Sequence, residues 1–163
     1  MAGRRPNRGR ITRGALAGGV AAGVWALQQP LDKRALGCAY DDVELLGRAL
    51  APLARRGRWY PLGMALHVHN GMAFGAVYAG AIAPLLARGG GPPAARGPLV
   101  AQVENFALWP LGRLSDRFHP ARGELPRLIG SRRALAQATW RHLLFGFVLG
   151  ELERRWNGEP VRR

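Results

Sequence analysis

The chain has 163 residues and a formal net charge of +14 at pH 7, with 24 Lys and Arg against 10 Asp and Glu. This length suits one domain, or a few membrane spans with their loops. The charge points to an anionic partner, either nucleic acid or the surface of a membrane. Cys38 is the sole cysteine, so an internal disulfide is excluded.

Four apolar blocks alternate with arginine-rich segments, at residues 11–31, 60–87, 97–112 and 134–152. A membrane span needs about 20 predominantly apolar residues. The second block is longer than that and contains no Asp, Glu, Lys or Arg, whereas the third and fourth are shorter. We expect an all-α polytopic membrane helix bundle of about four transmembrane helices. It would form a single membrane domain over residues 1–163, with basic tails at 1–10 and 153–163.

A further helix is predicted between the first two blocks, in the stretch DDVELLGRALAPLARR. Val43, Leu46, Leu50 and Leu53 would share one face of this amphipathic helix. A basic amphipathic helix between spans often lies flat in the headgroup region. The alternative is an ordinary loop helix packed on the bundle.

Trp59, Trp109 and Trp156 stand near the ends of blocks, which suits the aromatic belt of a bilayer. Four spans would place both termini on the same side of the membrane. The arginines and the single lysine divide almost equally between the two sides, so their distribution does not set the orientation. We expect both termini in the cytoplasm of a bacterial inner membrane, because translocating the arginine-dense N-terminus would be costly.

The second and fourth blocks share a motif, H-x3-G-x3-G, at His67-Gly71-Gly75 and at His142-Gly146-Gly150. Spacing by four puts the histidine and both glycines on one helical face. We infer a two-helix unit used twice, in the same orientation. Small residues at this spacing let helices pack closely in lipid, and the glycines expected to do so are Gly14, Gly18, Gly19, Gly23, Gly71, Gly75, Gly146 and Gly150.

His67 and His142 lie at matching depths in the two units. Two histidines at one depth, each beside glycines, could ligate haem b from both sides or hold a metal ion. They could also belong to a proton or ion path, or form hydrogen bonds between helices. His69 is turned by about 200° from His67, at about 100° per residue, so both cannot face one ligand.

Glu104 and Arg141 are intramembrane charges if their blocks span the bilayer. Such charges usually face the interior and pair with each other. The two residues fall at the same depth if the third and fourth blocks are antiparallel neighbours. We therefore predict a Glu104–Arg141 ion pair, the alternative being an Arg141 side chain that reaches the interface.

Catalytic motifs are absent from the sequence: there is no P-loop, no H-E-x-x-H and no C-x-x-C. Enzymatic activity is therefore not expected. Asp116 and His119 could form a weak metal or lipid-headgroup site in the loop SDRFHP, although a helix cap or turn explains them as well.

The stretch HNGMAFGAVYAG, with its histidine leading into Gly-x3-Gly and its Tyr78 and Gly80, resembles small bacterial inner-membrane proteins of the YagU-like kind. The resemblance covers mainly the first two blocks. It implies an all-helical inner-membrane protein with no established chemistry.

The main interpretation is a small integral membrane protein with a structural, assembly or transport-related role. Its Arg-rich edges would bind anionic lipid headgroups, and its partners could include other membrane subunits or further copies of the same chain. One alternative is a haem- or metal-binding membrane subunit that uses His67 and His142. The other is a soluble, basic, helical nucleic-acid-binding protein, which would need a basic stripe along one helix.

Overall fold

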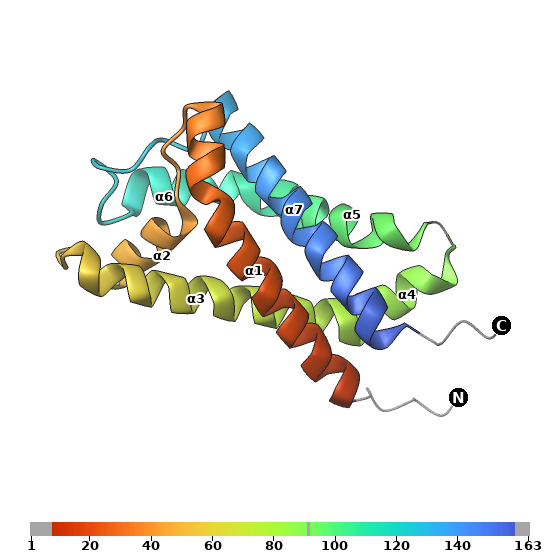
Figure 1. Ribbon diagram of the computed structural model, residues 1–163. Coiled ribbons are helices and arrows are strands. Elements are labelled where there is room, and N and C mark those ends of the chain that lie inside the picture. Colours follow the sequence, from red (N-terminus) through yellow and green to blue (C-terminus); the bar gives the residue numbers. More distant parts are fainter. Residues whose placement is uncertain (1–7, 91, 159–163) are drawn as a thin grey trace.

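The computed structural model describes residues 8–90 and 92–158, which fold into helices joined by turns (Figure 1). The elements are α1 (Arg8–Leu36), α2 (Asp42–Leu50), α3 (Arg56–Val77), the π-helix η1 (Tyr78–Ile82), α4 (Ala83–Arg88), α5 (Pro93–Leu108), the 3-10 helix η2 (Trp109–Leu111), α6 (Gly112–Phe118) and α7 (Arg132–Asn157). The predicted all-helical bundle is confirmed.

Each apolar block coincides with one long helix. The first lies within α1, the second within the continuous helix from α3 to α4, the third in α5 and η2, and the fourth within α7. Of the two basic tails, residues 8–10 belong to α1 and residues 153–157 to α7. Residues 1–7 and 159–163 lie outside the described part of the chain.

Local signals explain where several helices begin and end. The side chain of Asp41 caps α2 by accepting a hydrogen bond from the backbone N–H of Glu44 at 3.0 Å, and Ser131 caps α7 in the same way. The φ angle of Gly37 is 57°, a left-handed conformation that commonly follows the last turn of a helix and here follows α1.

The bundle is built around α1 and α7. Helix α1 packs against both α3 and α7, and α5 packs on α7. Figure 1 shows α1 and α7 side by side in opposite directions, with the described chain ends at the same end of the bundle. There Arg10 forms an ion pair with Glu153, and Arg13 Nε donates to Asn157 Oδ1 at 2.7 Å.

Glycine contacts repeat from the first helix pair to the second. A Cβ atom on Gly18 would lie 2.0 Å from the carbonyl oxygen of Gly71, so the backbones of α1 and α3 touch there. A Cβ atom on Gly97 would lie 2.1 Å from the carbonyl oxygen of Gly146, at the crossing of α5 and α7. Each crossing uses the first glycine of H-x3-G-x3-G, so the two units pack in matching ways.

The other glycines of the predicted packing faces differ in their surroundings. Gly14 approaches the carbonyl oxygen of Gly75, and a Cβ atom on Gly19 would meet the side chain of Met72 at 3.0 Å. Gly23 has open space where its Cβ atom would be, so it lies outside the packed interface. Gly97, which the sequence analysis did not single out, takes part instead.

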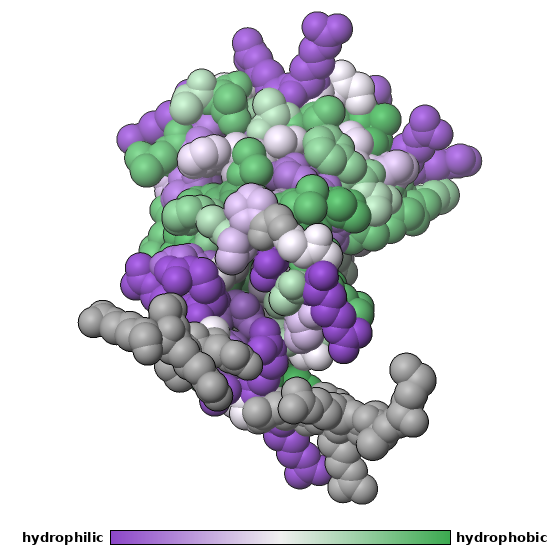
Figure 2. Space-filling model, turned by 90° about the vertical axis from the view of Figure 1, so that its right-hand side faces the viewer, coloured by the Kyte–Doolittle hydropathy of each residue, from purple (hydrophilic) through white to green (hydrophobic). Residues whose placement is uncertain are grey.

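The interior holds large apolar side chains, including Trp25, Tyr78, Phe145 and Leu149, together with many small and polar residues. Small residues and polar groups fill much of the interior, where Ala17, Ala21, Ala101, Gln137 and Arg141 are all 0% exposed. Large apolar side chains face outward on all four long helices, among them Leu27, Leu31, Val77, Leu99, Val103, Phe106 and Phe147. On the face shown in Figure 2, apolar side chains gather in the upper half, with hydrophilic groups at its edges and below it.

Length and hydropathy single out only the helix from Arg56 to Arg88 as able to cross a membrane, among the described residues. A single such helix is weak evidence, since the core helix of a soluble protein passes the same test. The core helix of a soluble protein is mostly buried, whereas only 28% of the apolar 18-residue window within Arg56–Arg88 is buried. The expected four spans are thus not shown by this criterion.

Helix α2 packs on the bundle through glycines. A Cβ atom on Gly47 would lie 2.2 Å from the carbonyl oxygen of Trp59, and one on Gly63 would lie 2.0 Å from that of Val43. Leu50 is 61% exposed and Leu53 99% exposed. The helix is therefore fixed to α3, with two apolar side chains left on the surface beside it.

Candidate functional site

The most unusual residue of the chain is Arg141, whose side chain is fully buried in the middle of α7. Its Nε donates to Asp32 Oδ2 at 2.6 Å and its Nη2 to Asp32 Oδ1 at 2.7 Å, a two-point contact. Its Nη1 donates to Asp42 Oδ2 at 2.8 Å, and Nη2 also reaches the carbonyl oxygen of Tyr40. The guanidinium is thus paired and hydrogen-bonded, as a buried charge requires.

Asp32, near the end of α1, accepts hydrogen bonds from the side chains of Gln28, Gln137 and Arg141. Gln28 Nε2 donates to Oδ2 and Gln137 Nε2 to Oδ1, both at 2.6 Å, in addition to the two bonds from Arg141. Each carboxylate oxygen therefore accepts two hydrogen bonds. Gln28 is held in turn by Trp140, whose Nε1 donates to Gln28 Oε1 at 3.0 Å.

Asp42, the first residue of α2, is surrounded by aromatic donors. Trp25 Nε1 donates to its Oδ2 at 3.0 Å, and the Tyr40 hydroxyl donates to its Oδ1. Burial raises the pKa of Tyr40 well above its usual value, and the charge of Asp42 raises it further. The phenol therefore stays protonated and serves as a permanent donor. The guanidinium of Arg141 lies 5.4 Å from the centre of the Tyr40 ring.

A cavity of about 260 Å³ lies beside this network. Its walls come from α1, α2, α3, α5 and α7, and it brings together both predicted histidines, His67 and His142, together with Glu104. Asp42 and Trp25 form part of the wall, so the cavity borders the arginine network directly. This is the candidate functional site.

His142 and Glu104 form a pair on the cavity wall. His142 Nδ1 donates to the carbonyl oxygen of Ala138 at 2.7 Å, and Nε2 lies 3.3 Å from Glu104 Oε2. Nδ1 carries the proton of this hydrogen bond, so Nε2 is an ion-pair partner of Glu104 only when it is protonated as well.

His67 is buried and makes a contact across helices. Its Nε2 donates to the carbonyl oxygen of Ala22 in α1 at 3.2 Å. In both units the histidine Nε2 thus reaches the facing helix, α1 for His67 and α5 for His142. His69 is exposed, in agreement with its rotation away from His67.

The predicted Glu104–Arg141 ion pair is wrong. Arg141 pairs with Asp32 and Asp42, whereas Glu104 pairs with His142, the next residue of α7. One step along a helix turns a side chain by about 100°, which directs Arg141 toward α1 and His142 toward α5. The sequence analysis missed Asp32 because it placed that residue outside the first block.

Trp25 occupies the place expected for a ligand shared by the two histidines. Its ring centre lies 5.3 Å from that of His67 and 4.7 Å from that of His142, with an edge-on arrangement in both cases. Haem b held by both imidazoles would have to displace this indole. No group of three or more His, Cys, Asp or Glu placed to hold a metal ion occurs in the described part of the chain.

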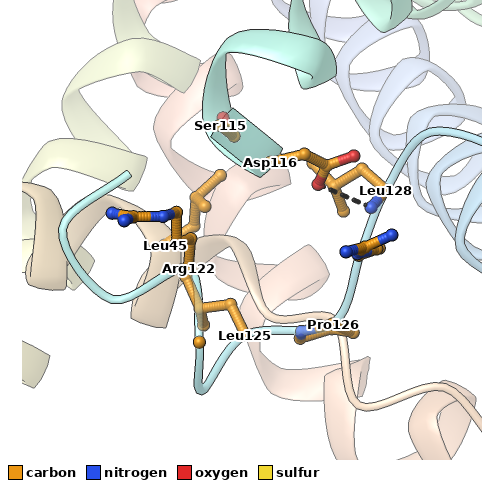
Figure 3. A pocket seen from close by; sticks show the side chains of 9 residues that line it. Leu45, Ser115, Asp116, Arg122, Leu125, Pro126 and Leu128 are labelled. Atoms are coloured by element: carbon orange, nitrogen blue, oxygen red, sulfur yellow. Dashed lines mark hydrogen bonds between the residues drawn. The ribbon is translucent and has the colours of Figure 1, made fainter. Parts of the chain in front are cut away.

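The loop after α6 has a pocket of about 270 Å³ of its own, shown in Figure 3. Asp116 accepts hydrogen bonds from the backbone N–H groups of Leu128 and Ile129, at 2.8 and 2.9 Å. His119 Nε2 donates to the carbonyl oxygen of Leu45, and its Nδ1 accepts from the backbone of Ala121. Both residues therefore hold the loop in place, which accounts for them without a metal.

The arginines of the long helices stand near helix ends, with Arg141 as the exception. They include Arg8, Arg10, Arg13 and Arg34 in α1, Arg56 and Arg58 in α3, Arg88 in α4, Arg96 in α5, and Arg132, Arg133, Arg154 and Arg155 in α7. This is not the stripe along one helix that a nucleic-acid-binding helix would present.

No family model matches this chain, and neither a curated protein nor a solved structure does so. The argument for function therefore depends on the geometry alone.

Proposed function

We propose that this chain is a polytopic membrane protein in which α1, α3–α4, α5 and α7 cross the bilayer. The observation that carries the proposal is the exposure of large apolar side chains on all four long helices, around an interior rich in small and polar residues. Lipid gives helices no hydrophobic reason to associate, so their contacts rely on small residues and on interior polar groups. The glycine crossings and the Arg141 network are contacts of these two kinds.

The arginine-rich ends of the helices would lie at the two membrane surfaces and bind anionic headgroups. A basic residue near an anionic surface contributes roughly 1 kcal/mol to membrane binding. Arg55, Arg56 and Arg58 are all exposed at the start of α3, beside the exposed Leu53. Together these residues suit the boundary between headgroups and acyl chains, with Arg55 to Arg58 facing phosphates and Leu53 facing lipid.

In this proposal the protein resides in a bacterial inner membrane with both chain ends in the cytoplasm. The role we assign is structural or transport-related, and the cavity beside Arg141 supports transport or ligand binding over pure scaffolding. Further membrane subunits or a second copy could complete the assembly.

Membrane insertion is tested by fractionation and by labelling. The protein should stay in the membrane pellet after treatment with high salt and with alkaline carbonate, and should dissolve only in detergent. Release by high salt alone would refute insertion and favour the soluble, basic alternative.

Crossing by α5 is tested with single cysteines in a Cys38→Ala background. Ala94 is exposed at the start of α5, and Gly123 lies in the loop beyond its other end with open space around its Cα. A membrane-impermeant maleimide should label Ala94→Cys and Gly123→Cys from opposite sides. Labelling of both from one side would show that α5 does not cross.

A further inference from the structure

The cavity beside Trp25 combines aromatic walls with negative charge, in a protein that is otherwise strongly basic. Aromatic side chains line it, namely Trp25, Tyr40, Phe74 and Phe145, and Phe74 and Phe145 pack edge to face with ring centres 5.4 Å apart. The Tyr40 ring already lies against the guanidinium of Arg141, which leaves Trp25, Phe74 and Phe145 for a ligand. Such surfaces attract organic cations, because the face of an aromatic ring carries partial negative charge.

The charged groups of this wall favour a cation as well. Asp32 and Asp42 carry two negative charges against the single positive charge of Arg141, which leaves the buried network net negative. Glu104 adds a third carboxylate, and its side chain is 36% exposed, so it is reachable from the cavity mouth. His67, which faces the cavity from α3, is already bonded to a backbone carbonyl group.

The size and shape of the cavity restrict the ligand to a small molecule. A volume of about 260 Å³ compares with about 30 Å³ for one water in the liquid, so on the order of eight non-hydrogen atoms would fit. The exposed side chain of Asn70 lines the cavity from α3, and Glu104 does so from α5. An opening between these two residues would admit a ligand from the side of the bundle.

We propose that this cavity binds a small organic cation, such as a quaternary or primary amine. The cation approaches the Glu104 carboxylate while its apolar groups contact Trp25 and Phe145.

The test is choline binding to the full-length protein in a nonionic detergent, measured by equilibrium dialysis. Choline is a probe of the ligand class, and its uncharged isostere 3,3-dimethylbutan-1-ol is the matched control ligand. We expect saturable choline binding. We expect binding of the isostere to be at least tenfold weaker.

Two carboxylate variants separate the site from general electrostatics. Glu104→Gln should weaken choline binding at least tenfold. Glu151 lies on the surface of α7 beside Arg154 and Arg155. Glu151→Gln should therefore leave choline binding within twofold of the wild type. Asn70→Leu, which narrows the mouth with an apolar group, should also weaken binding.

Absence of saturable binding would overturn the proposal, as would equal binding of the two ligands, which would define a purely apolar cavity. An unchanged affinity in Glu104→Gln would also overturn it. The measurement uses purified protein and does not depend on whether the helices span a bilayer, so it is independent of the membrane proposal.

Discussion

Replacement of Asp32 by Asn should destabilise the protein more than any other single change of a surface or interior carboxylate. The substitution removes one of two negative charges beside a fully buried guanidinium. It also converts one carboxylate oxygen into an NH₂ group. Each oxygen of Asp32 accepts two hydrogen bonds, so two donors would then face another donor.

Arg141 keeps Asp42 as its counter-ion in this variant, but two buried donors lose their acceptor, at a cost of about 1–3 kcal/mol each. For a chain of this length, each kcal/mol lowers the midpoint of thermal unfolding by about 2–4 °C. Asp32→Asn should therefore unfold about 4–24 °C below the wild type, as measured by circular dichroism in detergent. Glu151→Gln, which alters only exposed ion pairs, should shift the midpoint by less than about 3 °C.

The double variant Asp32→Asn, Arg141→Met completes the test. The two residues contact each other directly, and Asp42 keeps its donors Trp25 and Tyr40 when Arg141 is replaced. The double variant should therefore lose less stability than the sum of the two single effects. A midpoint for Asp32→Asn within about 2 °C of the wild type would refute the reasoning. So would a double variant that loses the sum of both single effects.

Three further changes test other parts of the structure. Gly18→Ala should destabilise the bundle by about 1–3 kcal/mol in chemical unfolding, because its Cβ atom would lie 2.0 Å from a carbonyl oxygen of α3. Gly23→Ala should be neutral or stabilising by up to about 1 kcal/mol, because nothing lies within 4 Å of the position of its Cβ atom. Equal effects of Gly18→Ala and Gly23→Ala would contradict the packing of α1 on α3. Tyr40→Phe should cost about 1 kcal/mol at neutral pH. The pKa of Tyr40 is raised in the folded protein. The stabilisation that its hydroxyl provides is therefore complete below about pH 10 and is lost as the pH rises further. The difference in unfolding free energy between Tyr40→Phe and the wild type should shrink accordingly in alkali. Asp116→Ala should speed hydrogen exchange at the Leu128 amide by tenfold or more, since that amide loses its acceptor; unchanged exchange would show that the loop is held by other contacts.

The sequence predicts the helices well because the signals for them are local. Apolar runs and the spacing of Gly71 and Gly75 by four residues depend only on the period of a helix. The contact of this face with Gly18 follows from the small-residue spacing in both helices. Gly23 shares that spacing and is nevertheless unpacked, because it is turned by about 100° from Ala22, and it is Ala22 that contacts Gly71 of α3.

The partners of Arg141 depend on how α1 and α7 cross, which a single sequence does not reveal. Asp32 lies 109 residues and Asp42 99 residues before the arginine. The expected depths in the membrane place Glu104 opposite Arg141, one residue away from its partner His142. Depth does not determine the direction in which a side chain points around the helix axis. One available signal was the placement of Asp32 directly after an apolar block, beside Gln28 and Gln29.

The long separation of Asp32 from Arg141 has a consequence for biosynthesis. Ribosomes add about 5–20 residues per second, so the 109 residues between the two positions take roughly 5 to 20 s to synthesise. During that interval α1 exists with a carboxylate that lacks its partner, and a chain truncated before α7 keeps it unpaired. Synthesis of the C-terminal helix is therefore the step that gives Asp32 of the first helix its ion-pair partner.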